Sequence, residues 1–537
     1  MSHQNQLILV VIYIFISKIG MAAEIVAPPP SIEPNQYEHR QSNLKTSKLP
    51  IQKLSLNEAI ALALSHNRTI KTAYLQRITD KWSLYVARDE FRPNLDLDIS
   101  TTAADTIDKS TGTRTRTYTT SYSPTASLAL RTGGSLSATW NNSYTRSKDD
   151  DAGVGTPSHT SGISLSFSQP LLKGGGLEVA QASQVQAERA EQVNLLSLKS
   201  SLISTITSVI QAYRSLVQTK RAYEISKDSL ERTRKLLEVN KLLIDAGRMA
   251  AVESIQAEAD LARGELDLRT SENSLDAARL ALLRILDIDK YSRIDIIEDL
   301  DINEVDLNFD KLQTIAFAER TDYLQAKLGL LDSQLNLILA KNNKLWELGL
   351  TASYSNTLTN RSRHEVSRNL GEISEADYSL GMSLKIPFGD YTLEQTVVNA
   401  RIALKNQQLA LIELKDEILI GLEDQIRDIN IKFEQVRLAK RSRELAEQTL
   451  FIENEKLRAG RSSNFELVSF QNSLVTAENS EVDAIIAYHN ALTSLDEFLG
   501  TTLDTWGIEI QNITRKSDIN KISDIPEIEE INFDQKK

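Results

Sequence analysis

Few residues of this 537-residue chain have types and spacings that suggest bond-making chemistry. The chain has no cysteine, which excludes disulfides, thiolate metal sites, cysteine nucleophiles and the acylated cysteine of a lipoprotein. Lys173-Gly174-Gly175-Gly176 lacks the Gly-Lys-Ser/Thr ending of a phosphate-binding loop, and a strand-to-helix turn explains it. No serine, histidine and acid set stands out. The six histidines show no metal-ligand spacing: His3, His39, His66, His159, His364 and His489. We therefore expect no enzyme, no cofactor and no metal site.

The most distinctive polar positions are two copies of the tripeptide Ala-Gly-Arg, each followed by an acid. Ala246-Gly247-Arg248 precedes Glu253, and Ala459-Gly460-Arg461 precedes Glu466. Glycine can adopt the left-handed conformation that ends one helix and allows an antiparallel partner to begin. Each tripeptide is therefore expected to form the turn of a helical hairpin. The plain alternative for each acid is a solvated glutamate on a helix face, and charged residues near helix ends are common without a special role.

Composition favours long helices. Charged residues make up 25% of the chain and aromatic residues only 6%, while glycine and proline are few. The formal net charge of −12 argues against a nucleic-acid partner, because phosphate binding requires a basic face.

The N-terminus predicts export. An apolar run over residues 7–16 is too short to span a bilayer and is followed by small residues, so residues 1–23 are expected to be a cleaved signal peptide rather than a retained anchor. Residues 24–50 are expected to form a flexible linker and residues 510–537 a polar C-terminal tail. No later segment is expected to be long and apolar enough to cross a membrane as a helix.

The chain between these ends repeats itself. A helix-opening pattern at Leu54 recurs at Leu307, and the tripeptide at Gly247 recurs at Gly460. We expect a first structural repeat over residues 51–300 and a second over 301–509. Each repeat should contain a helix, strands (93–170 and 346–388), a very long helix, a glycine turn and a further helix.

The strand regions alternate apolar residues with small polar ones, for example in residues 95–100, 163–168, 348–354 and 378–384. A soluble sandwich can show this pattern, but in an exported chain without a transmembrane helix a barrel wall with lipid outside and water inside is the better interpretation.

The two strand regions differ in length. The first, from Pro93 to Pro170, is much longer than the second, from Trp346 to Pro387. The excess fits an extra hairpin near residues 124–146 with a turn at 132–134. The sequence leaves open whether that hairpin enters the barrel or stands above it.

The two long helices predict coiled-coil packing. Neither proline nor glycine interrupts residues 177–246, and only Gly421 interrupts 391–459, so each helix should be about 100 Å long. Apolar residues recur every seven positions on two neighbouring lines, which suggests neighbours on two sides, as in the wall of a tube. An elongated two-stranded coiled coil would need one seam only. The lines are Leu195, Leu202, Val209 and Leu216 beside Leu196, Ile203, Ile210 and Val217, and Leu422, Ile429 and Val436 beside Leu419, Ile426 and Phe433.

From about Leu54 to Trp506 the chain resembles the TolC-like outer-membrane factors. The similar segments are LSLNEAIALALSHNRTIKTA (54–73) with its weaker copy at 307–326, FRPNLDLDIS (91–100), SFSQPLLKGGG (166–176), LKIPFGD (384–390) and both Ala-Gly-Arg turns. The chain departs from the family where a proline is usual near the end of the first helix, since Arg68 and Thr321 stand there.

The resemblance implies a mainly α chain with a β-barrel portion, internally duplicated. It also implies a homotrimer that forms one outer-membrane β-barrel and a long α-helical coiled-coil tunnel in the periplasm. Four strands from each copy would give twelve, and six would give eighteen. The implied function is the outer-membrane channel of a tripartite efflux or type I secretion system. Its partners would be a periplasmic adaptor protein, an inner-membrane pump and outer-membrane lipid.

The resemblance also assigns site residues. The tips of the helical hairpins, where the adaptor docks, would be Ala246, Gly247, Arg248, Ala459, Gly460 and Arg461. Glu253, Glu466 and Arg458 would lie at the periplasmic aperture, where the acid at Glu466 forms a constricting ring and the arginines contribute salt bridges. A second acidic ring of some members falls on Ser469. Trp140, Trp346 and Tyr391 are candidates for interfacial aromatic belts.

A trimeric coiled-coil surface or structural protein is the alternative from another class. It predicts one continuous heptad rod, which the two interrupted copies disfavour.

Overall fold

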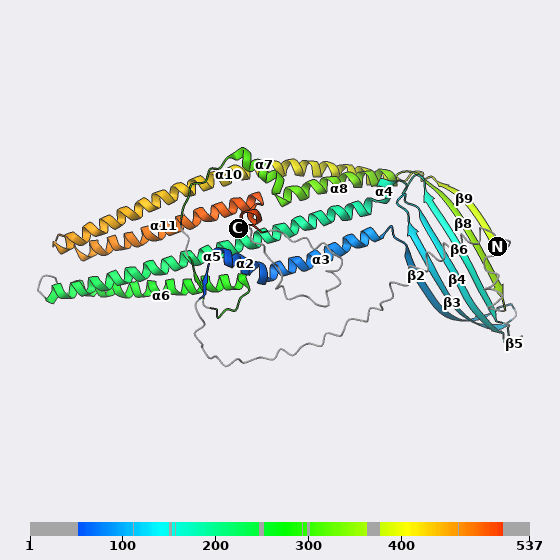
Figure 1. Cartoon of the computed structure of the whole chain (residues 1–537), viewed down its shortest axis with the longest axis horizontal. Coiled ribbons are helices and arrows are strands. Elements are labelled where there is room, and N and C mark those ends of the chain that lie inside the picture. Colours follow the sequence, from blue (N-terminus) through cyan, green and yellow to red (C-terminus); the bar gives the residue numbers. More distant parts are fainter. Residues whose placement is uncertain are drawn as a thin grey trace. The chain divides into compact units, whose positions relative to one another are not determined.

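The computed structural model describes residues 52–110, 112–149, 153–155, 157–245, 252–292, 294–297, 301–361, 376–459 and 461–508. The expected signal peptide, the linker and the C-terminal tail lie outside these residues. The described residues belong to one unit that spans residues 51–537. This unit is mainly helical with a sheet portion, as predicted (Figure 1).

The first half runs from a short strand through helices, a set of long strands and two very long helices. Its elements are β1 Gln52–Leu54, α2 Leu56–His66, α3 Arg68–Asp89, β2 Asn94–Ile107, β3 Arg114–Ala129, β4 Ser135–Asp149, β5 Gly153–Val154, β6 Ser158–Pro170, α4 Leu177–Ala180, α5 Ala182–Asp245, α6 Val252–Leu286 and β7 Ile294–Ile296. β1 and β7 pair in parallel.

The second half has the same order of elements with fewer strands. They are α7 Phe309–Glu319, α8 Thr321–Asn343, β8 Glu347–Asn360, β9 Ala376–Lys385, α10 Tyr391–Arg458, α11 Asn464–Leu499 and α12 Thr502–Thr505.

In each half, two consecutive helices (α2 and α3, α7 and α8) are separated by a single residue, which stands at the N-cap position of the second helix. Asn67 accepts hydrogen bonds from the amides of Thr69 and Ile70 and so starts α3. Arg320 occupies the equivalent place before α8, at the same offset that relates the two helix-opening patterns. Helix α2 starts on a capping box, in which Ser55 and Glu58 bond to each other's backbone amides.

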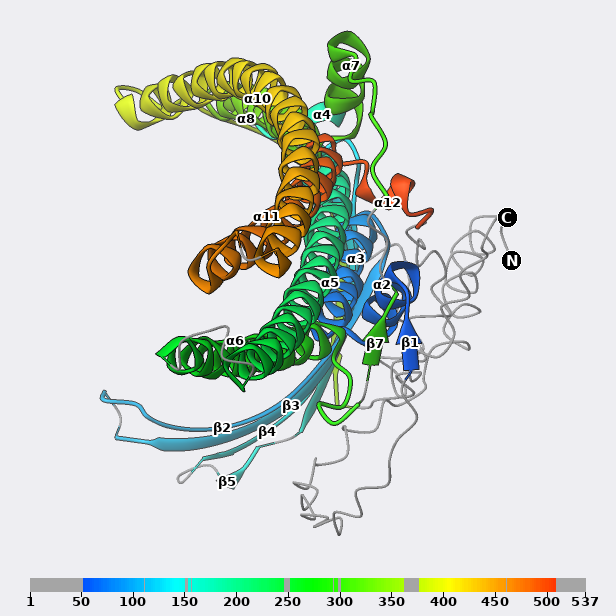
Figure 2. The same cartoon turned by 90° about the vertical axis from the view of Figure 1, so that its left-hand side faces the viewer.

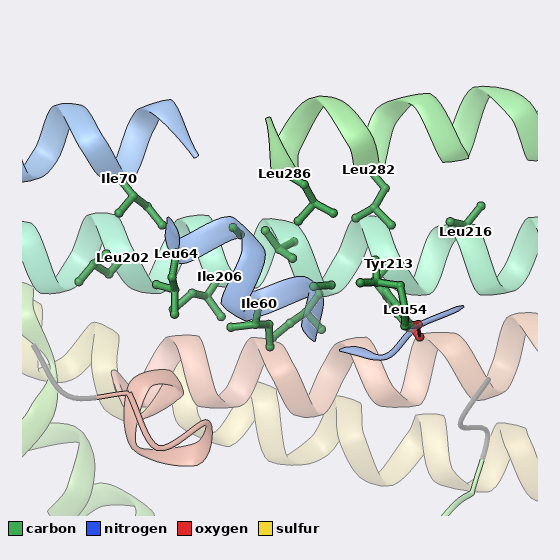
Figure 3. Close-up of a cluster of buried hydrophobic side chains, with 14 of the residues drawn as sticks. Leu54, Ile60, Leu64, Ile70, Leu202, Ile206, Tyr213, Leu216, Leu282 and Leu286 are labelled. Atoms are coloured by element: carbon green, nitrogen blue, oxygen red, sulfur yellow. Dashed lines mark hydrogen bonds between the residues drawn. The ribbon is translucent and has the colours of Figure 1, made fainter. Parts of the chain in front are cut away.

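The core of the first half lies along α5. Its predicted apolar lines are buried from Leu202 to Val217 and pack against α2, α3 and α6 (Figure 3). The hydroxyl of Tyr213 donates to the carbonyl oxygens of Leu54 (2.9 Å) and Ile297 (2.6 Å), so the core helix also fixes the β1–β7 pair.

One expectation about α5 was wrong. The helix contains an 18-residue window with a mean hydropathy of 1.4, long and apolar enough by composition to cross a membrane, and 44% of that window is buried inside the protein. The window is apolar because this stretch of α5 packs against α2, α3, α6 and α11 at once. The apolar side chains of this window therefore contribute to the hydrophobic core.

The core of the second half lies between α10 and α11. Leu422, Ile429 and Val436, one of the predicted lines of α10, are buried there. Gly421 lies where α10 comes close to α11: a Cβ there would be 2.8 Å from Cε2 of Phe498, so the ring would have to shift. The interruption noted in the sequence is thus a close approach of the two helices.

The helices form a layer with neighbours on two sides, which is the arrangement that the doubled apolar lines predict. Near the sheet, neighbouring pairs are α3–α5, α5–α8 and α8–α10; toward the hairpin ends they are α6–α5, α5–α11 and α11–α10. Figure 2 shows α6, α5, α11 and α10 as a curved row. Within the described residues no pairing joins α10 to α3 or α6, so the row has two open ends.

The long strands form one antiparallel sheet in the order β2-β3-β4-β6-β8-β9, with β5 paired to β4. The extra hairpin, left open by the sequence, is β3–β4. It lies inside this sheet, between β2 and β6.

Candidate functional site

The sheet has one apolar face that continues across all six strands. Because side chains alternate along a strand, register partners lie on the same face. One chain of partners runs from Leu95 through Ala126, Ala138, Leu165 and Tyr354 to Tyr378. Large side chains on this face are exposed, with Leu97 at 62% and Leu380 at 77%. An exposed apolar surface of this extent requires a non-aqueous neighbour.

The opposite face is lined by small hydroxyl side chains. Its partners run from Asn94 through Ser127, Ser137, Ser166 and Ser353 to Ser379. Hydroxyls of neighbouring strands bond to each other, as in Ser137–Ser166 (2.6 Å), Ser353–Ser379 (2.7 Å) and Ser100–Ser121 (2.7 Å). This face suits contact with water.

Several aromatic side chains lie near the middle of the apolar face. Trp140 packs edge-to-face with Tyr122, and its indole N–H donates to the Ser161 hydroxyl at 3.0 Å. Tyr354 packs on Tyr378 in the same region. Trp346 and Tyr391 lie at the helix-proximal end, where both are exposed. Of the three candidates for interfacial belts, Trp346 and Tyr391 thus lie at the helix-proximal end of the apolar face, and Trp140 lies near its middle.

Both edge strands of the sheet lack a neighbour among the described residues. Every residue of β2 is exposed, and so is almost every residue of β9. Unpaired backbone donors and acceptors cannot be satisfied in lipid, and in water an open edge beside an apolar face invites pairing with another chain, so these edges favour further strands.

The helical row also ends in unpartnered apolar residues. On α10, Ile431, Leu438, Leu445 and Ile452 recur every seven residues and are exposed. The opposite end carries Leu75 and Trp82 of α3 and Leu266 and Leu280 of α6, also exposed. The sequence analysis missed the α10 line, although its seven-residue spacing was readable. Burial alone distinguishes it from the two core lines.

The predicted hairpin tips lie only partly within the described residues. Ala246, Gly247, Arg248 and Gly460 lie outside them, as does the side chain of Glu253. Ala459 caps the end of α10, and the amide of Arg461 donates to the carbonyl of Lys456 at 2.8 Å. Arg458 pairs with Glu455 on its own helix at 2.9 Å, and both side chains are mostly exposed.

Glu466 caps its own helix. Its carboxylate accepts bonds from the Ser463 amide (3.1 Å) and the Ser462 hydroxyl (3.1 Å), while its amide donates to the Ser463 hydroxyl (3.3 Å). These bonds to the charged form hold the pKa of Glu466 below its usual value. Glu466 and Ser469 are both exposed, and Glu466 makes no ion pair with Arg458.

Glu453 is a second tip acid that the sequence analysis missed. It is 5% exposed and accepts bonds from the Ser462 hydroxyl and from Lys456 (3.0 Å), which lower its pKa. Glu453 and Glu466 thus share Ser462 across the turn. Only the fold brings them together, since they lie on different helices.

Within the described residues no group of three or more metal-ligating side chains converges. A groove of about 670 Å³ lies between the start of α7 and α10, beside the exposed line of α10. It is lined by apolar Leu307, Phe309, Ile426, Ile431 and Leu438 and by polar Glu423, Arg427, Asn430, Glu434 and Gln435.

Solved structures of other proteins share this fold. No family model and no curated protein matches the sequence. Among solved structures, the CmeC outer-membrane channel of Campylobacter jejuni superposes with a TM-score of 0.61 at 16% identity, covering 88% of this chain and 89% of that one. CusC, described as forming a transmembrane channel, gives 0.62 at 14% identity, covering 83% and 91%. The outer-membrane protein VceC of Vibrio cholerae gives 0.60 at 15% identity, covering 85% and 97%. The fold that the resemblance to TolC-like outer-membrane factors predicts for a single chain is confirmed, while the closed barrel and the tunnel stay predictions.

Proposed function

We propose that this chain, which has the fold of outer-membrane channel proteins, is one of three identical subunits of a passive conduit across the outer membrane. The observation that carries the proposal is the two-faced sheet with unpaired edges. Lipid would cover its apolar face and water would fill the side lined by hydroxyls.

Closure needs further copies of the chain. Each neighbour in the strand order is antiparallel, so β9 runs opposite to β2. Pairing β9 of one copy with β2 of the next continues the antiparallel pattern and satisfies both edges. Six strands are too few to enclose a lumen alone, and three copies give the closed ring that the resemblance implies.

The helical row would close in the same way. The exposed line Ile431, Leu438, Leu445 and Ile452 of one copy can pack against the exposed residues of α3 and α6 of the next. Seven-residue spacing suits this knobs-into-holes packing. The closed row would form the periplasmic coiled-coil tunnel.

In this proposal the conduit is the outer component of a tripartite efflux or type I secretion system. An inner-membrane pump would supply the energy, and a periplasmic adaptor would dock at the tips, at Ala246-Gly247-Arg248 and Ala459-Gly460-Arg461. Glu253, Glu466 and Arg458 remain the proposed aperture residues. The helix cap of Glu466 supports a fixed position for that carboxylate at the start of α11.

The rival proposal, a trimeric coiled-coil surface protein, leaves the apolar face and the sheet edges unexplained. A structural stalk needs one heptad seam. This chain instead exposes an apolar line on α10 in addition to its buried ones.

Cross-linking between copies tests the closure. Because the chain has no cysteine, Ser100→Cys in β2 and Ser379→Cys in β9 introduce the only two thiols. They lie on opposite edges of one sheet, so a short bifunctional thiol reagent should link different copies only. In outer membranes we expect covalent dimers and trimers, with the series ending at three. The single variant Ser100→Cys should give none. Monomers alone, or a series that continues beyond three, would contradict the proposal.

A further inference from the structure

The sheet has more strands than there are connections to the helical row. Four strands connect directly to helices, since β2 follows α3, β6 leads into α4 and α5, β8 follows α8 and β9 leads into α10. The β3–β4 hairpin leaves and re-enters the sheet without a helix of its own. It therefore widens the sheet and leaves the helical row unchanged.

The hairpin is part of the wall along its whole length. β3 pairs with β2 from Asn94↔Ser127 to Ile107↔Arg114, and β4 pairs with β6 from Ser135↔Ser168 to Thr145↔Ser158. Both faces continue across it, because apolar Ala138 lies opposite Leu165 and polar Ser137 lies opposite Ser166. A hairpin standing above the barrel would need neither feature.

The turn of the hairpin is built into the junction of sheet and helices. Gly133 has a φ of +91°, and a Cβ there would overlap the carbonyl oxygen of Gly174. The amide of Gly176 and the side-chain amide of Gln169 both donate to the carbonyl of Thr132, at 3.1 and 3.0 Å. The glycine run at 174–176 thus accommodates this turn where β6 passes into α4.

The bore face of the wall carries charged side chains on its outer strands, as Asp96, Asp98, Glu347, Asp377 and Lys385, and short uncharged side chains on β3 and β6. On β3 it presents Thr115, Thr117, Thr119, Ser121, Ser123, Thr125, Ser127 and Ala129, and on β6 it presents Ser158, Thr160, Gly162, Ser164, Ser166 and Ser168. These side chains are short, so they leave the bore open, and they offer hydrogen bonds to solutes of either charge.

We propose that the barrel closes with eighteen strands and that its wide bore admits bulky hydrated cargo, up to a pair of α-helices of a polypeptide. The inference rests on the trimeric conduit proposed above. Eighteen strands spaced ~4.8 Å apart and tilted by ~40° make a backbone cylinder about 36 Å across, against about 24 Å for twelve. An α-helix with its side chains is ~11 Å wide, so two fit beside each other. The helical tunnel, and not the barrel, then limits the size of the cargo.

Thiol accessibility tests where the hairpin lies. Ser137→Cys and Ala138→Cys on β4 are matched by Ser166→Cys and Leu165→Cys, their register partners on β6. In trimers reconstituted into planar bilayers, a charged, membrane-impermeant thiol reagent should modify the cysteines at 137 and 166 and lower the single-channel conductance in both. The cysteines at 138 and 165 should react only with a lipid-soluble reagent.

The outcomes separate the two proposals. If the β6 pair behaves as described while both β4 cysteines react with the impermeant reagent without a change in conductance, the hairpin stands outside the wall and the eighteen-strand bore is wrong. If no variant forms channels or trimers, the conduit itself is wrong.

Polymer exclusion tests the width directly. Neutral polymers ~20 Å across, added from the side opposite the helical tips, should enter the bore and reduce the conductance. Exclusion of polymers half that size would overturn the wide bore while leaving the conduit intact.

Discussion

A guanidinium nitrogen of Arg320 donates a hydrogen bond to the carbonyl oxygen of Phe498 at 3.0 Å, and the guanidinium lies 4.2 Å from the centre of the Phe498 ring. In the first half the side-chain amide of Asn67 donates to the carbonyl of Ile285 at 2.7 Å. The donors are related by the offset of the two helix-opening patterns, and the acceptors by the offset of the two Ala-Gly-Arg turns. Both halves therefore contain the same contact, in which the residue between the first two helices donates to a carbonyl near the end of the later hairpin helix. The donor is Asn67 in the first half and Arg320 in the second.

Replacing Arg320 tests this contact. Arg320→Lys should lower the free energy of unfolding by about 1–2 kcal/mol, because an ammonium cannot bond the Phe498 carbonyl, stack on the ring and pair with Asp322 together. Arg68→Lys is the control, since its pair with Asp287 leaves the arginine 85% exposed. Thermal melts followed by circular dichroism should show a loss for Arg320→Lys alone. Equal losses would show that the contact contributes nothing special.

Gly421 should tolerate no side chain. Gly421→Ala places a Cβ 2.8 Å from the ring of Phe498, so overpacking should cost about 1–3 kcal/mol despite the better helix propensity of alanine. Gly264→Ala in α6 meets only the flexible end of Leu230, at 3.2 Å, and should be neutral or stabilising. The same melts measure both variants. A melting temperature for Gly421→Ala at or above that of the unsubstituted protein would contradict the close approach.

Asn240 should lower the stability of the contact between the two helical hairpins. It is fully buried near the end of α5, and neither atom of its amide has a hydrogen-bond partner among the described residues. It follows by one turn Leu236, which packs with Leu450 and Leu467 of the other hairpin. Asn240→Leu should stabilise the closed helices by about 1–3 kcal/mol, because the cost of the buried amide is removed.

The measurement for Asn240→Leu is the open probability in planar bilayers together with the melting temperature. If the two helical hairpins separate less readily, the channel should open several-fold less often. Leu236→Asn is a control with the opposite expected effect: it places an amide in the apolar contact with Leu450 and Leu467, so the channel should open more often. Unchanged opening in both variants would show that this part of the interface does not move.

The cap of α11 predicts a pH dependence. The pKa of Glu466 is lowered in the folded protein, so its ionised form contributes stability above the pKa of the unfolded chain, about 4.3, and this contribution is lost as pH falls through the lower folded value. Glu466→Gln should therefore be less stable at pH 7, and the difference from the unsubstituted protein should shrink as the pH falls below about 4.3. A difference for Glu466→Gln that is constant with pH would rule out the charged cap.

The exposed line of α10 predicts the assembly interface. Leu438→Glu should weaken the trimer at least tenfold, because a carboxylate would replace a leucine at the helical seam, while the helix content of each chain stays the same. Lys440→Glu, an exposed charge reversal off this line, should assemble normally. Light scattering after size exclusion in detergent gives the masses. Intact trimers of Leu438→Glu would place the interface elsewhere.

Periodicity predicted much of this fold. The alternation of residues 163–168 and the heptads of Leu422, Ile429 and Val436 identify strand and helix faces because regular elements repeat regularly. The place of the extra hairpin was not predictable, since it depends on a close approach of Gly133 and Gly174 that joins segments far apart in the sequence. Nor was the role of Glu453, which meets Ser462 only after the α10–α11 turn forms.

Burial settled which apolar lines face the core. Ile429 and Ile431 are both apolar and close neighbours in the sequence, yet the first is 2% exposed and the second 47%. Composition cannot distinguish a core line from an interface line, because both are apolar for the same physical reason. The exposed line on α10, which we propose as an interface, is distinguished from the core lines only by its exposure in the folded chain.

In the proposed function, copies of this chain enclose water across a membrane, which single-channel recording of the purified protein in planar bilayers can detect. We expect discrete ion-conducting steps of low open probability, from particles with the mass of three chains. A membrane-associated protein that never conducts, either unsubstituted or with Leu236→Asn loosening the helices, would contradict it.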